Sequence, residues 1–292
     1  MKNKQLIAHL MMLITSFLAA TSFPIAGLIT KDLPPVILMF ARFLLAAILF
    51  APYVIKTNGL QLPEFSKLRL YSILSIFLVT FFWCMFESLR YTSVLNTGAL
   101  YTLVPAFTAV FALFINRIKT SKGHSMALLI GTIGALWIVF KGDYVAFFSM
   151  SINYGDYVFL IGALSLSIYN TLIKKFYSGE PMQVMTFWVL ISGTLWLLLA
   201  SKGAVFEVNW LGLAPRVYAG LLYLSFFTTL ITFFLLQLSV IEIGPTKVAA
   251  YSFLTPVFIT IINFFAGLAE FEMASIPGIL LVLIAMILML RK

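Results

Sequence analysis

The stretch GALYTLVPAFTAVFALFI, residues 98–115, decides how the chain is organised, because a similar stretch occurs a second time. It is an apolar run with Pro105 near its middle, and the run AAYSFLTPVFITIINFFA, residues 249–266, carries Pro256 at the same place. A shift of 151 residues aligns the two prolines and makes 5 of the 18 aligned positions identical. This pattern predicts that the second half of the chain repeats the first.

The composition assigns the chain to a membrane. It has 292 residues, of which 62% are hydrophobic and 10% charged, with a mean hydropathy of +1.06. A soluble domain carries about 25% charged residues, so we expect a polytopic membrane protein. The net charge of +9 does not indicate nucleic-acid binding, because the basic residues cluster at the ends of apolar runs, as topology signals do.

Ten apolar runs are long enough to cross a bilayer, since a spanning helix needs about 20 residues. The sequence therefore predicts an all-α fold of ten transmembrane helices joined by short connections, with a seam at residues 141–154 between a first five-helix repeat, 1–140, and a second, 155–292. The predicted helices cover residues 6–29, 35–55, 69–89, 94–115, 124–140, 155–174, 181–200, 213–239, 244–267 and 273–290.

Lys and Arg predict the orientation. With the N-terminus in the cytoplasm, 13 of the 19 basic residues fall in inner segments and 5 in outer segments, and Arg42 lies inside a helix. Because cytoplasmic loops carry the excess of Lys and Arg, we expect both termini in the cytoplasm, in a multi-pass protein of the inner membrane. Five helices is an odd number, so the two repeats must enter the membrane in opposite senses, as in many secondary transporters.

These residues resemble a known family. The stretches that carry the resemblance are RFLLAAILF (42–50), SLRYTSVLNTGALYTLVPAFTAVFALF (88–114), SFLTPVF (252–258), GLAEF (267–271) and PGILLVLIAMIL (277–288). In this order, and with ten spans in two repeats, the chain is similar to the EamA family of the drug/metabolite transporter superfamily. The resemblance implies export of small metabolites, including amino acids.

The two prolines are the first candidates for function. A proline inside a helix removes a backbone hydrogen bond and kinks the helix. We interpret Pro105 and Pro256 as gating kinks beside a central site; the alternative is that both kinks are static and serve packing.

Arg42 and Glu87 are the clearest charges inside predicted spans. A charge in the membrane is costly and normally pairs or lines a water-filled cavity. Both residues are predicted near the outer face, where they could form a pair that binds a zwitterion or takes a proton. The alternative is a structural pair that clamps two helices. A proton is thus a candidate coupling ion, and Glu87 is its candidate carrier.

Polar and aromatic side chains recur on several predicted helices and indicate a central cavity lined by aromatic groups. The alternative for any single hydroxyl is a hydrogen bond between packed helices. The candidate substrate-binding residues are Phe23, Trp83, Tyr101, Tyr169, Asn170, Thr232 and Tyr251.

Other classes of function find no support in the sequence. One cysteine, Cys84, and two distant histidines, His9 and His124, predict no metal site, and we expect no cofactor. There is no G-x-x-x-x-G-K-[ST], H-E-x-x-H or G-x-S-x-G motif, so an enzyme is not expected.

The sequence thus predicts a secondary transporter, acting as an exporter, for a small amphiphilic metabolite, most readily one like an amino acid, that works by alternating access. The alternative is an exporter or flippase of a lipid-like or drug-like molecule. We expect a small-molecule substrate and the lipid bilayer as partners, no nucleic acid, and a monomer or weak homodimer.

Overall fold

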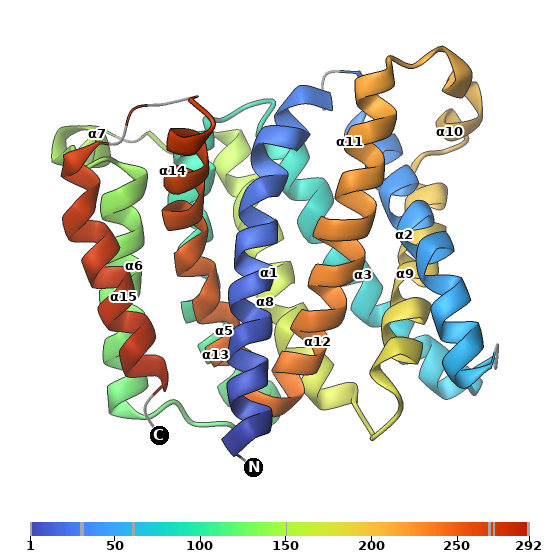
Figure 1. Cartoon of the computed structure of the whole chain (residues 1–292), viewed down its shortest axis with the longest axis horizontal. Helices are drawn as coiled ribbons and strands as arrows, with labels where there is room; N and C mark the ends of the chain where they lie inside the picture. Colours follow the sequence, from blue (N-terminus) through green and yellow to red (C-terminus); the bar gives the residue numbers. More distant parts are fainter. Residues whose placement is uncertain are drawn as a thin grey trace.

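The computed structural model describes residues 2–29, 32–59, 62–149, 151–267, 270 and 272–290. All regular secondary structure within these residues is helical, and ten of the helical segments there are long and apolar enough to cross a membrane (Figure 1). The predicted all-α fold with ten transmembrane helices is therefore confirmed.

Each half of the chain contributes five spans, and one span in each half is broken. The first half consists of α1 (Lys2–Ile29), α2 (Pro35–Asn58), α3 (Phe65–Ser88), the broken span of α4 (Val94–Tyr101) and α5 (Val104–Asn116), and α6 (Lys122–Val139). The second half consists of α8 (Tyr154–Phe176), α9 (Met182–Ala200), the span of α11 (Pro215–Ser225), a π-helical segment (Phe226–Ile231) and α12 (Thr232–Ile243), the broken span of α13 (Pro245–Ala250), a 3₁₀ turn (Tyr251–Phe253) and α14 (Leu254–Phe265), and α15 (Ile276–Leu290).

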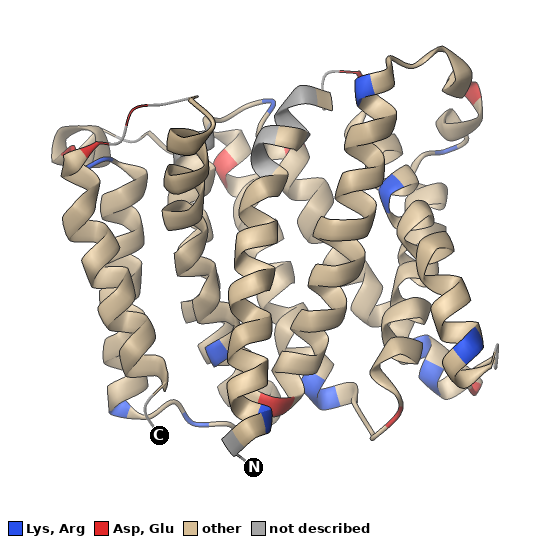
Figure 2. Cartoon of the chain, viewed as in Figure 1, with Lys and Arg blue, Asp and Glu red and all other residues tan. Residues whose placement is uncertain are grey.

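The two membrane faces of the bundle differ in what they carry. The start of α1 and the end of α15 lie on one face, which we call the terminal face (Figure 1). The opposite face, which we call the distal face, carries the short helices α7 (Tyr144–Phe148) and α10 (Ala204–Glu207), which lie in connections where the sequence analysis placed only loops. Charged residues gather toward the two ends of the helices (Figure 2), as expected where a hydrocarbon core makes charge costly.

The packing of the helices repeats between the two halves. α3 packs on α8 as α12 packs on α1, and α5 packs on α8 as α14 packs on α1. α9 packs on α3 as α11 packs on α2, while α2 with α9 and α6 with α15 form pairs of equivalent helices. Most major contacts thus have a counterpart, which is what two inverted copies of one five-helix unit produce, and the contact of α5 with α13 is the exception.

The break in each broken span coincides with its proline. α4 ends at Tyr101 and α5 begins at Val104, directly before Pro105. α13 ends at Ala250, and the 3₁₀ turn leads into α14 two residues before Pro256. Because proline has no backbone N–H to donate, the helical ladder is weakened at the same place in both copies. The kinks are present as breaks, whereas their gating role stays a prediction.

α6 and α15 lie unusually close together through two glycines. A Cβ atom placed on Gly134 would lie 2.8 Å from the carbonyl oxygen of Gly278, and one on Gly278 would lie 2.7 Å from the carbonyl oxygen of Gly134. No larger residue fits at either position without moving a backbone. This pair forms one end of the bundle in Figure 1, away from α2 and α9.

Candidate functional site

A large cavity enters the bundle from the distal face. Its volume is about 1140 Å³, and it lies between α4 on one side and α14 on the other. Its mouth carries charged residues from the distal connections, namely Asp32, Arg90, Lys141, Glu270 and Glu272. Below the mouth the lining is chiefly apolar, with Met85, Phe86, Ile138, Val139, Phe159 and Ile259. We call this cavity the chamber.

A smaller compartment continues the chamber into the middle of the bundle. Its volume is about 120 Å³. The two cavities adjoin each other, because they share six lining residues: Ser22, Arg42, Met85, Tyr101, Ser252 and Thr255. Three more of the predicted binding residues, Tyr169, Asn170 and Thr232, line this inner compartment. The structure therefore brings together four of the seven predicted binding residues, counting Tyr101, around one space.

Arg42 lies at the junction of the two cavities and is almost completely buried, with 2% of its surface exposed. Its Nε donates to Thr229 Oγ1, and its Nη2 donates to the carbonyl oxygen and to Oγ1 of Thr228, both at 2.8 Å. Both threonines belong to the π-helical segment, where the altered winding leaves backbone groups available. The guanidinium carbon also lies 4.9 Å from the centre of the Phe82 ring.

The expected pair between Arg42 and Glu87 does not form. Glu87 instead pairs with Arg90, one helical turn further along the chain, at 3.2 Å. α3 ends at Ser88, so Glu87 lies at the distal end of its helix, whereas Arg42 is held deeper by Thr228 and Thr229. Two buried neutral side chains and one carbonyl thus replace the predicted carboxylate, and this corrects the sequence-based hypothesis of a charge pair.

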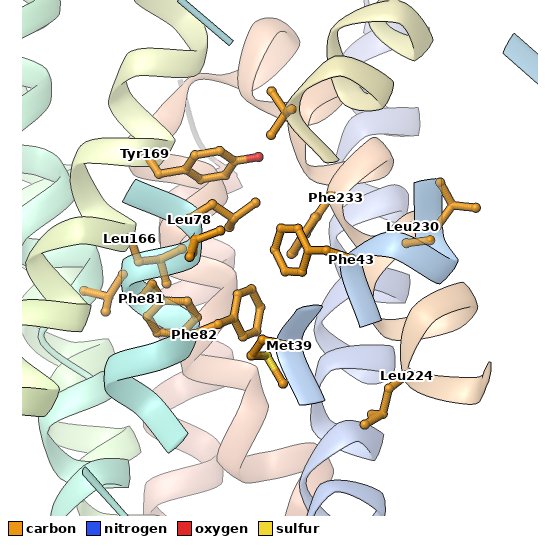
Figure 3. Close-up of a cluster of buried hydrophobic side chains, with 14 of the residues drawn as sticks. Met39, Phe43, Leu78, Phe81, Phe82, Leu166, Tyr169, Leu224, Leu230 and Phe233 are labelled. Atoms are coloured by element: carbon orange, nitrogen blue, oxygen red, sulfur yellow. The ribbon is translucent and has the colours of Figure 1, made fainter. Parts of the chain in front are cut away.

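Aromatic side chains from α2, α3 and α12 pack together beside the inner compartment (Figure 3). Phe82 lies 6.2 Å from Phe43 and 5.6 Å from Phe233 between ring centres, and Phe81 lies 6.3 Å from Tyr101. Phe81, Phe82 and Phe233 line the compartment directly. The predicted aromatic lining is present, but most of it comes from phenylalanines that the sequence analysis did not select.

Trp83 lies elsewhere than predicted. It is 39% exposed and lines neither cavity. Its neighbours Phe81 and Phe82 face inward, and one further residue turns a helix by about 100°, which directs Trp83 to the outside of the bundle. The side chain of Phe23, which was also predicted to bind substrate, lies outside the part of the chain that the structure describes.

Tyr251 and Tyr169 take part in closing the bundle toward the terminal face. The Tyr251 hydroxyl lies 2.8 Å from Nδ1 of His9, and Ser16 donates to the Tyr251 carbonyl oxygen at 3.0 Å. The Tyr169 hydroxyl accepts a hydrogen bond of 3.0 Å from Nε2 of Gln237. Thr186 in turn donates to Oε1 of Gln237. The bonds of Tyr251 join α1 to the 3₁₀ turn after α13, and the bonds of Gln237 join α12 to α8 and α9. They lie on the side of the inner compartment that faces the terminal face, where α5 also packs on α13.

The two candidate kinks differ in their relation to the chamber. Pro256 lines it, whereas Pro105 is buried and lines neither cavity. This difference follows from the asymmetry of the two faces: α14, which carries Pro256, borders the open side, and α5, which carries Pro105, belongs to the closed side.

Asp156 is a buried carboxylate that the sequence analysis missed. It is 1% exposed and accepts hydrogen bonds from Thr92 Oγ1 at 2.6 Å, Asn96 Nδ2 at 3.1 Å and the backbone N–H of Asn153 at 2.9 Å. Asn153 and Asp156 form a capping box at the start of α8. The N-x-x-D spacing in front of an apolar run was the signal that could have identified this network.

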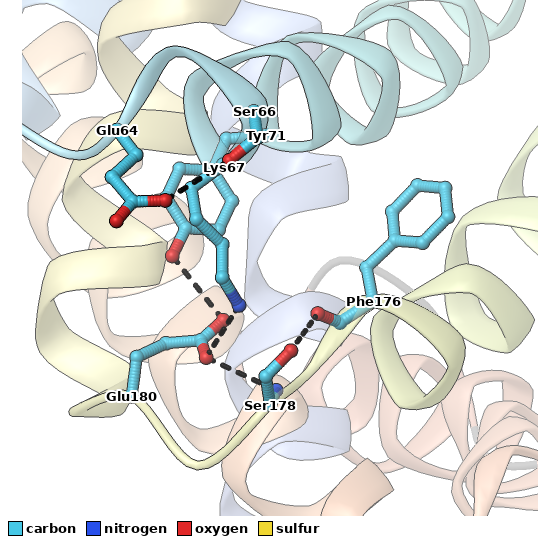
Figure 4. Close-up of polar contacts among 7 residues, drawn as sticks. All are labelled: Glu64, Ser66, Lys67, Tyr71, Phe176, Ser178 and Glu180. Carbon is cyan, nitrogen blue, oxygen red and sulfur yellow. Dashed lines mark hydrogen bonds and ion pairs between the residues drawn. The ribbon is translucent and has the colours of Figure 1, made fainter.

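Two ion pairs occupy equivalent places on opposite faces. At the terminal face, Lys67 in the first turn of α3 pairs at 3.1 Å with Glu180, which precedes α9 (Figure 4). At the distal face, Arg216 in the first turn of α11 pairs at 3.1 Å with Asp32, which precedes α2. Because α3 corresponds to α11 and α9 to α2, the inverted repeat explains both pairs.

The surroundings of Glu180 hold it in its charged form. Burial alone would raise the pKa of this carboxyl, but hydrogen bonds from backbone N–H groups, including that of Ser178 at 3.0 Å, and the Lys67 ammonium outweigh burial and lower the pKa. Tyr71 also donates to the carboxylate, at 3.2 Å (Figure 4).

Comparison with known proteins agrees with this geometry. The model of the EamA-like transporter family matches residues 6–140 and again 153–291. An uncharacterized transporter of Archaeoglobus fulgidus is 28% identical over 259 residues, which cover 88% of each chain. The uncharacterized transporter YyaM of Bacillus subtilis is 25% identical over 287 residues, 97% of this chain and 93% of that protein. A solved crystal structure with 16% identity superposes with a TM-score of 0.77 over 98% of this chain and 97% of that one, which shows the shared fold.

Ten spanning helices around a chamber that is open toward one face and closed toward the other define an integral membrane transporter. Since the family model matches nearly the whole chain, in two segments of similar length, the protein belongs to the EamA-like transporter family.

Proposed function

We propose that this transporter exports a small amphiphilic metabolite, most readily one like an amino acid, by alternating access through the chamber and its inner compartment. The observation that carries the proposal is the pair of adjoining cavities that extend from the distal face to Arg42, Tyr169 and Asn170 in the middle of the bundle. The space is largely apolar and has few polar groups, as sites for small organic molecules are. The outward direction rests on the resemblance to the EamA family.

The distribution of Lys and Arg supports an orientation for this transport. The excess of basic residues on the terminal face supports a cytoplasmic location for that face, according to the positive-inside rule. The chamber then opens outward, and the hydrogen bonds around Tyr251 and Gln237 close the path to the cytoplasm. We therefore assign the protein to the cytoplasmic membrane with both termini inside.

A lipid-like or drug-like substrate is the second candidate. The volume of the chamber, about 1140 Å³, slightly exceeds the range of about 300–1,000 Å³ that is typical of small-molecule sites. A molecule larger than an amino acid would fill it more completely, and the apolar lining from Phe86 to Ile259 would suit an acyl chain or ring system.

Counterflow in proteoliposomes tests the proposal. Vesicles loaded with unlabelled compound would be diluted into labelled compound, using a panel of amino acids, amines and nucleosides, with and without a pH gradient. We expect accumulation of apolar amino acids. Accumulation of none of the panel would favour the lipid-like candidate, and a rate that does not respond to the gradient would exclude proton coupling.

Two glycines provide matched variants for this assay. Gly98 lines the chamber, whereas Gly123 at the start of α6 has no atom within 4 Å of the position its Cβ would take. We expect Gly98→Trp to block counterflow and Gly123→Trp to preserve it. Equal activity in both variants would contradict transport through the chamber.

A further inference from the structure

Three exposed cations lie where α5 and α8 end at the terminal face. Asn116, the last residue of α5, donates from Nδ2 to the carbonyl oxygen of Thr171 in α8 at 3.0 Å, and this bond joins the two helix ends. Arg117 directly follows Asn116, and Lys174 and Lys175 follow Thr171 by about one helical turn. We call these three cations the basic edge: Arg117, Lys174 and Lys175.

The described part of the chain supplies no ion pair to the basic edge. The segments that contain it, residues 116–122 and 171–177, have five basic residues and no Asp or Glu. None of the ion pairs within the described residues includes a cation of the basic edge, although Lys67 on the same face is paired with Glu180 at 3.1 Å. Cations that the backbone holds close together repel each other, so an anion that binds across them relieves this repulsion.

The packing of α5 on α8 does not require these cations. The equivalent pair in the other copy is α14 on α1, and the two helices of that pair also pack on each other. The ends of α1 and α8 and the paired prolines align the two copies, and the aligned positions of the other copy carry no cation. The residues there are Gly27, Leu28 and Leu268.

Exposed apolar residues of both helices lead up to the basic edge. On α5, Val110 and Phe114 are exposed at a spacing of four residues, Phe114 by 75%. On α8, Ile161 and Leu164 are exposed, and Lys175 follows Leu164 by 11 residues, which is about three turns and therefore the same face. Acyl chains accept such side chains as readily as a protein interior does. The cations thus lie at the end of a lipid-facing surface, where the headgroups begin.

We propose that the basic edge binds the headgroup of an anionic phospholipid, with the acyl chains along Phe114 and Leu164. The planar guanidinium of Arg117 matches two phosphate oxygens, and the two ammonium groups add positive charge. A zwitterionic phospholipid compensates its own phosphate and is therefore bound less tightly. None of these residues lines the chamber or the inner compartment, so the site is separate from the transport path.

The same cations also act as topology signals, because cytoplasmic ends of spans carry the excess of Lys and Arg. A topology signal depends on how many charges lie near the ends of the spans, whereas a headgroup site depends on which residues carry them. Three other cations of the terminal face provide a matched control. They are exposed, they lie on α1, α2 and α3, and none belongs to an ion pair within the described chain: Lys4, Lys56 and Arg69.

The first test locates the lipid on the unaltered protein. Phosphatidylcholine nanodiscs would contain a small fraction of phosphatidylglycerol with a photoreactive diazirine in its acyl chain, and mass spectrometry would identify the labelled peptides. We expect the label to concentrate on the terminal halves of α5 and α8, and the same probe on phosphatidylcholine to spread over the bundle. The same distribution for both lipids would overturn the proposal. Excess inorganic phosphate should leave the label in place, and loss of the label would assign the basic edge to a free phosphate ion instead.

The second test compares two variants that each lose three positive charges. The variant of the basic edge carries Arg117→Gln, Lys174→Gln and Lys175→Gln. The control carries Lys4→Gln, Lys56→Gln and Arg69→Gln. Each basic residue near an anionic headgroup contributes about fivefold to binding. Native mass spectrometry should therefore show phosphatidylglycerol binding weakened by at least about tenfold in the first variant and by less than about threefold in the control. Equal weakening in both would overturn the proposal, because only total charge would then matter.

Folding and orientation are checked in parallel. Thermal unfolding, and labelling of a cysteine added at the C-terminus, show whether both variants fold and insert in the same sense. If the triple variant of the basic edge does not insert, Lys175→Gln with Lys56→Gln as its control keeps the comparison. We then expect binding of phosphatidylglycerol to weaken about threefold to fivefold in Lys175→Gln and to be unchanged in Lys56→Gln. No difference between these two would overturn the headgroup site.

Discussion

The broken spans behave differently at the two faces of the bundle. At the terminal half, α5 packs directly on α13, and hydrogen bonds around Tyr251 and Gln237 close the inner compartment toward the terminal face. At the distal half, α4 and α14 stand on opposite sides of the chamber and both line it. The inverted repeat makes α5 equivalent to α14 and α13 equivalent to α4, so the same kind of helix pair is closed on one side and open on the other.

This difference indicates what must move during transport. A contact that is formed in one copy is available to the other copy, because both are built from the same unit. Under the proposed alternating access, we predict that the opposite state brings α4 onto α14 and separates α5 from α13, with the helix breaks at Pro105 and Pro256 as the points of bending. The pairs α2 with α9 and α6 with α15 relate equivalent helices to each other and need not change.

The largest effect is expected from locking the open side. In a Cys84→Ala background, Gly98→Cys and Ile259→Cys place thiols on α4 and α14 across the chamber. We expect a disulfide or a short bifunctional linker to stop counterflow almost completely, by about tenfold or more, because the chamber can no longer reopen. Mass spectrometry measures the cross-link, reduction should restore transport, and each single-cysteine variant is a control. Full transport by the cross-linked protein would contradict the proposed movement.

A smaller effect is expected from weakening the closed side. Gln237 is fully buried and binds both Tyr169 and Thr186. Gln237→Leu leaves two buried hydroxyls without this partner, which costs about 1–3 kcal/mol for each group. The equilibrium should therefore shift toward opening at the terminal face. Labelling of a cysteine introduced at Thr232 by a reagent added at the terminal face measures the shift, and we expect an increase of at least about fivefold. Tyr169→Phe, which removes only one hydroxyl, should give the smaller increase.

The sequence was sufficient for the spans but not for the face that each span buries. Apolar runs, the spacing of Lys and Arg, and the paired prolines all carry their signal locally. In a helix that is apolar all round, the buried face is not marked by composition, because lipid accepts the same side chains as the protein interior. This is why Trp83 was selected in place of Phe81 and Phe82.

Residues whose partners lie far away in the chain were the hardest to predict. Arg42 bonds to Thr228 and Thr229, which lie 186 and 187 positions further along the chain. The π-helical segment that contains these threonines has no proline or glycine from which it could have been predicted. Gln237 is a single polar residue between apolar ones, and its bonds reach Tyr169 and Thr186. Such partners depend on tertiary packing, which local patterns do not contain.

Restoring a continuous helix should slow transport moderately. Pro256→Ala supplies an N–H that can reach the carbonyl of Ser252 and favours straightening at the 3₁₀ turn. Alanine is preferred over proline in a helix by about 3 kcal/mol, and a part of this would oppose bending. We expect a decrease of roughly threefold to tenfold in the counterflow rate. Pro105→Ala should act in the same direction, because the repeat gives both prolines one role; an effect of one proline alone would show that only one break moves.

The smallest effect is expected from the two equivalent ion pairs, Lys67 with Glu180 and Arg216 with Asp32. Both are formed although one face is open and the other closed, so neither responds to the state of the transporter. Glu180→Gln and Asp32→Asn should therefore each lower stability by less than about 1 kcal/mol, as partly exposed pairs do, without changing which face is open. Thermal unfolding and cysteine labelling at both faces measure this.

The difference in stability between the unaltered protein and Glu180→Gln should depend on pH. The pKa of Glu180 is lowered in the folded protein, so the pair stabilises the fold fully above the unfolded pKa of about 4.3. This stabilisation is lost as pH falls through the lower, folded pKa. Unaltered protein and Glu180→Gln should thus differ in unfolding temperature at pH 7 and converge below about pH 4. A difference that persists in acid would show that the loss of stability does not come from the ion pair, and altered labelling at either face would assign the pair to the closing movement instead of to the fixed part of the bundle.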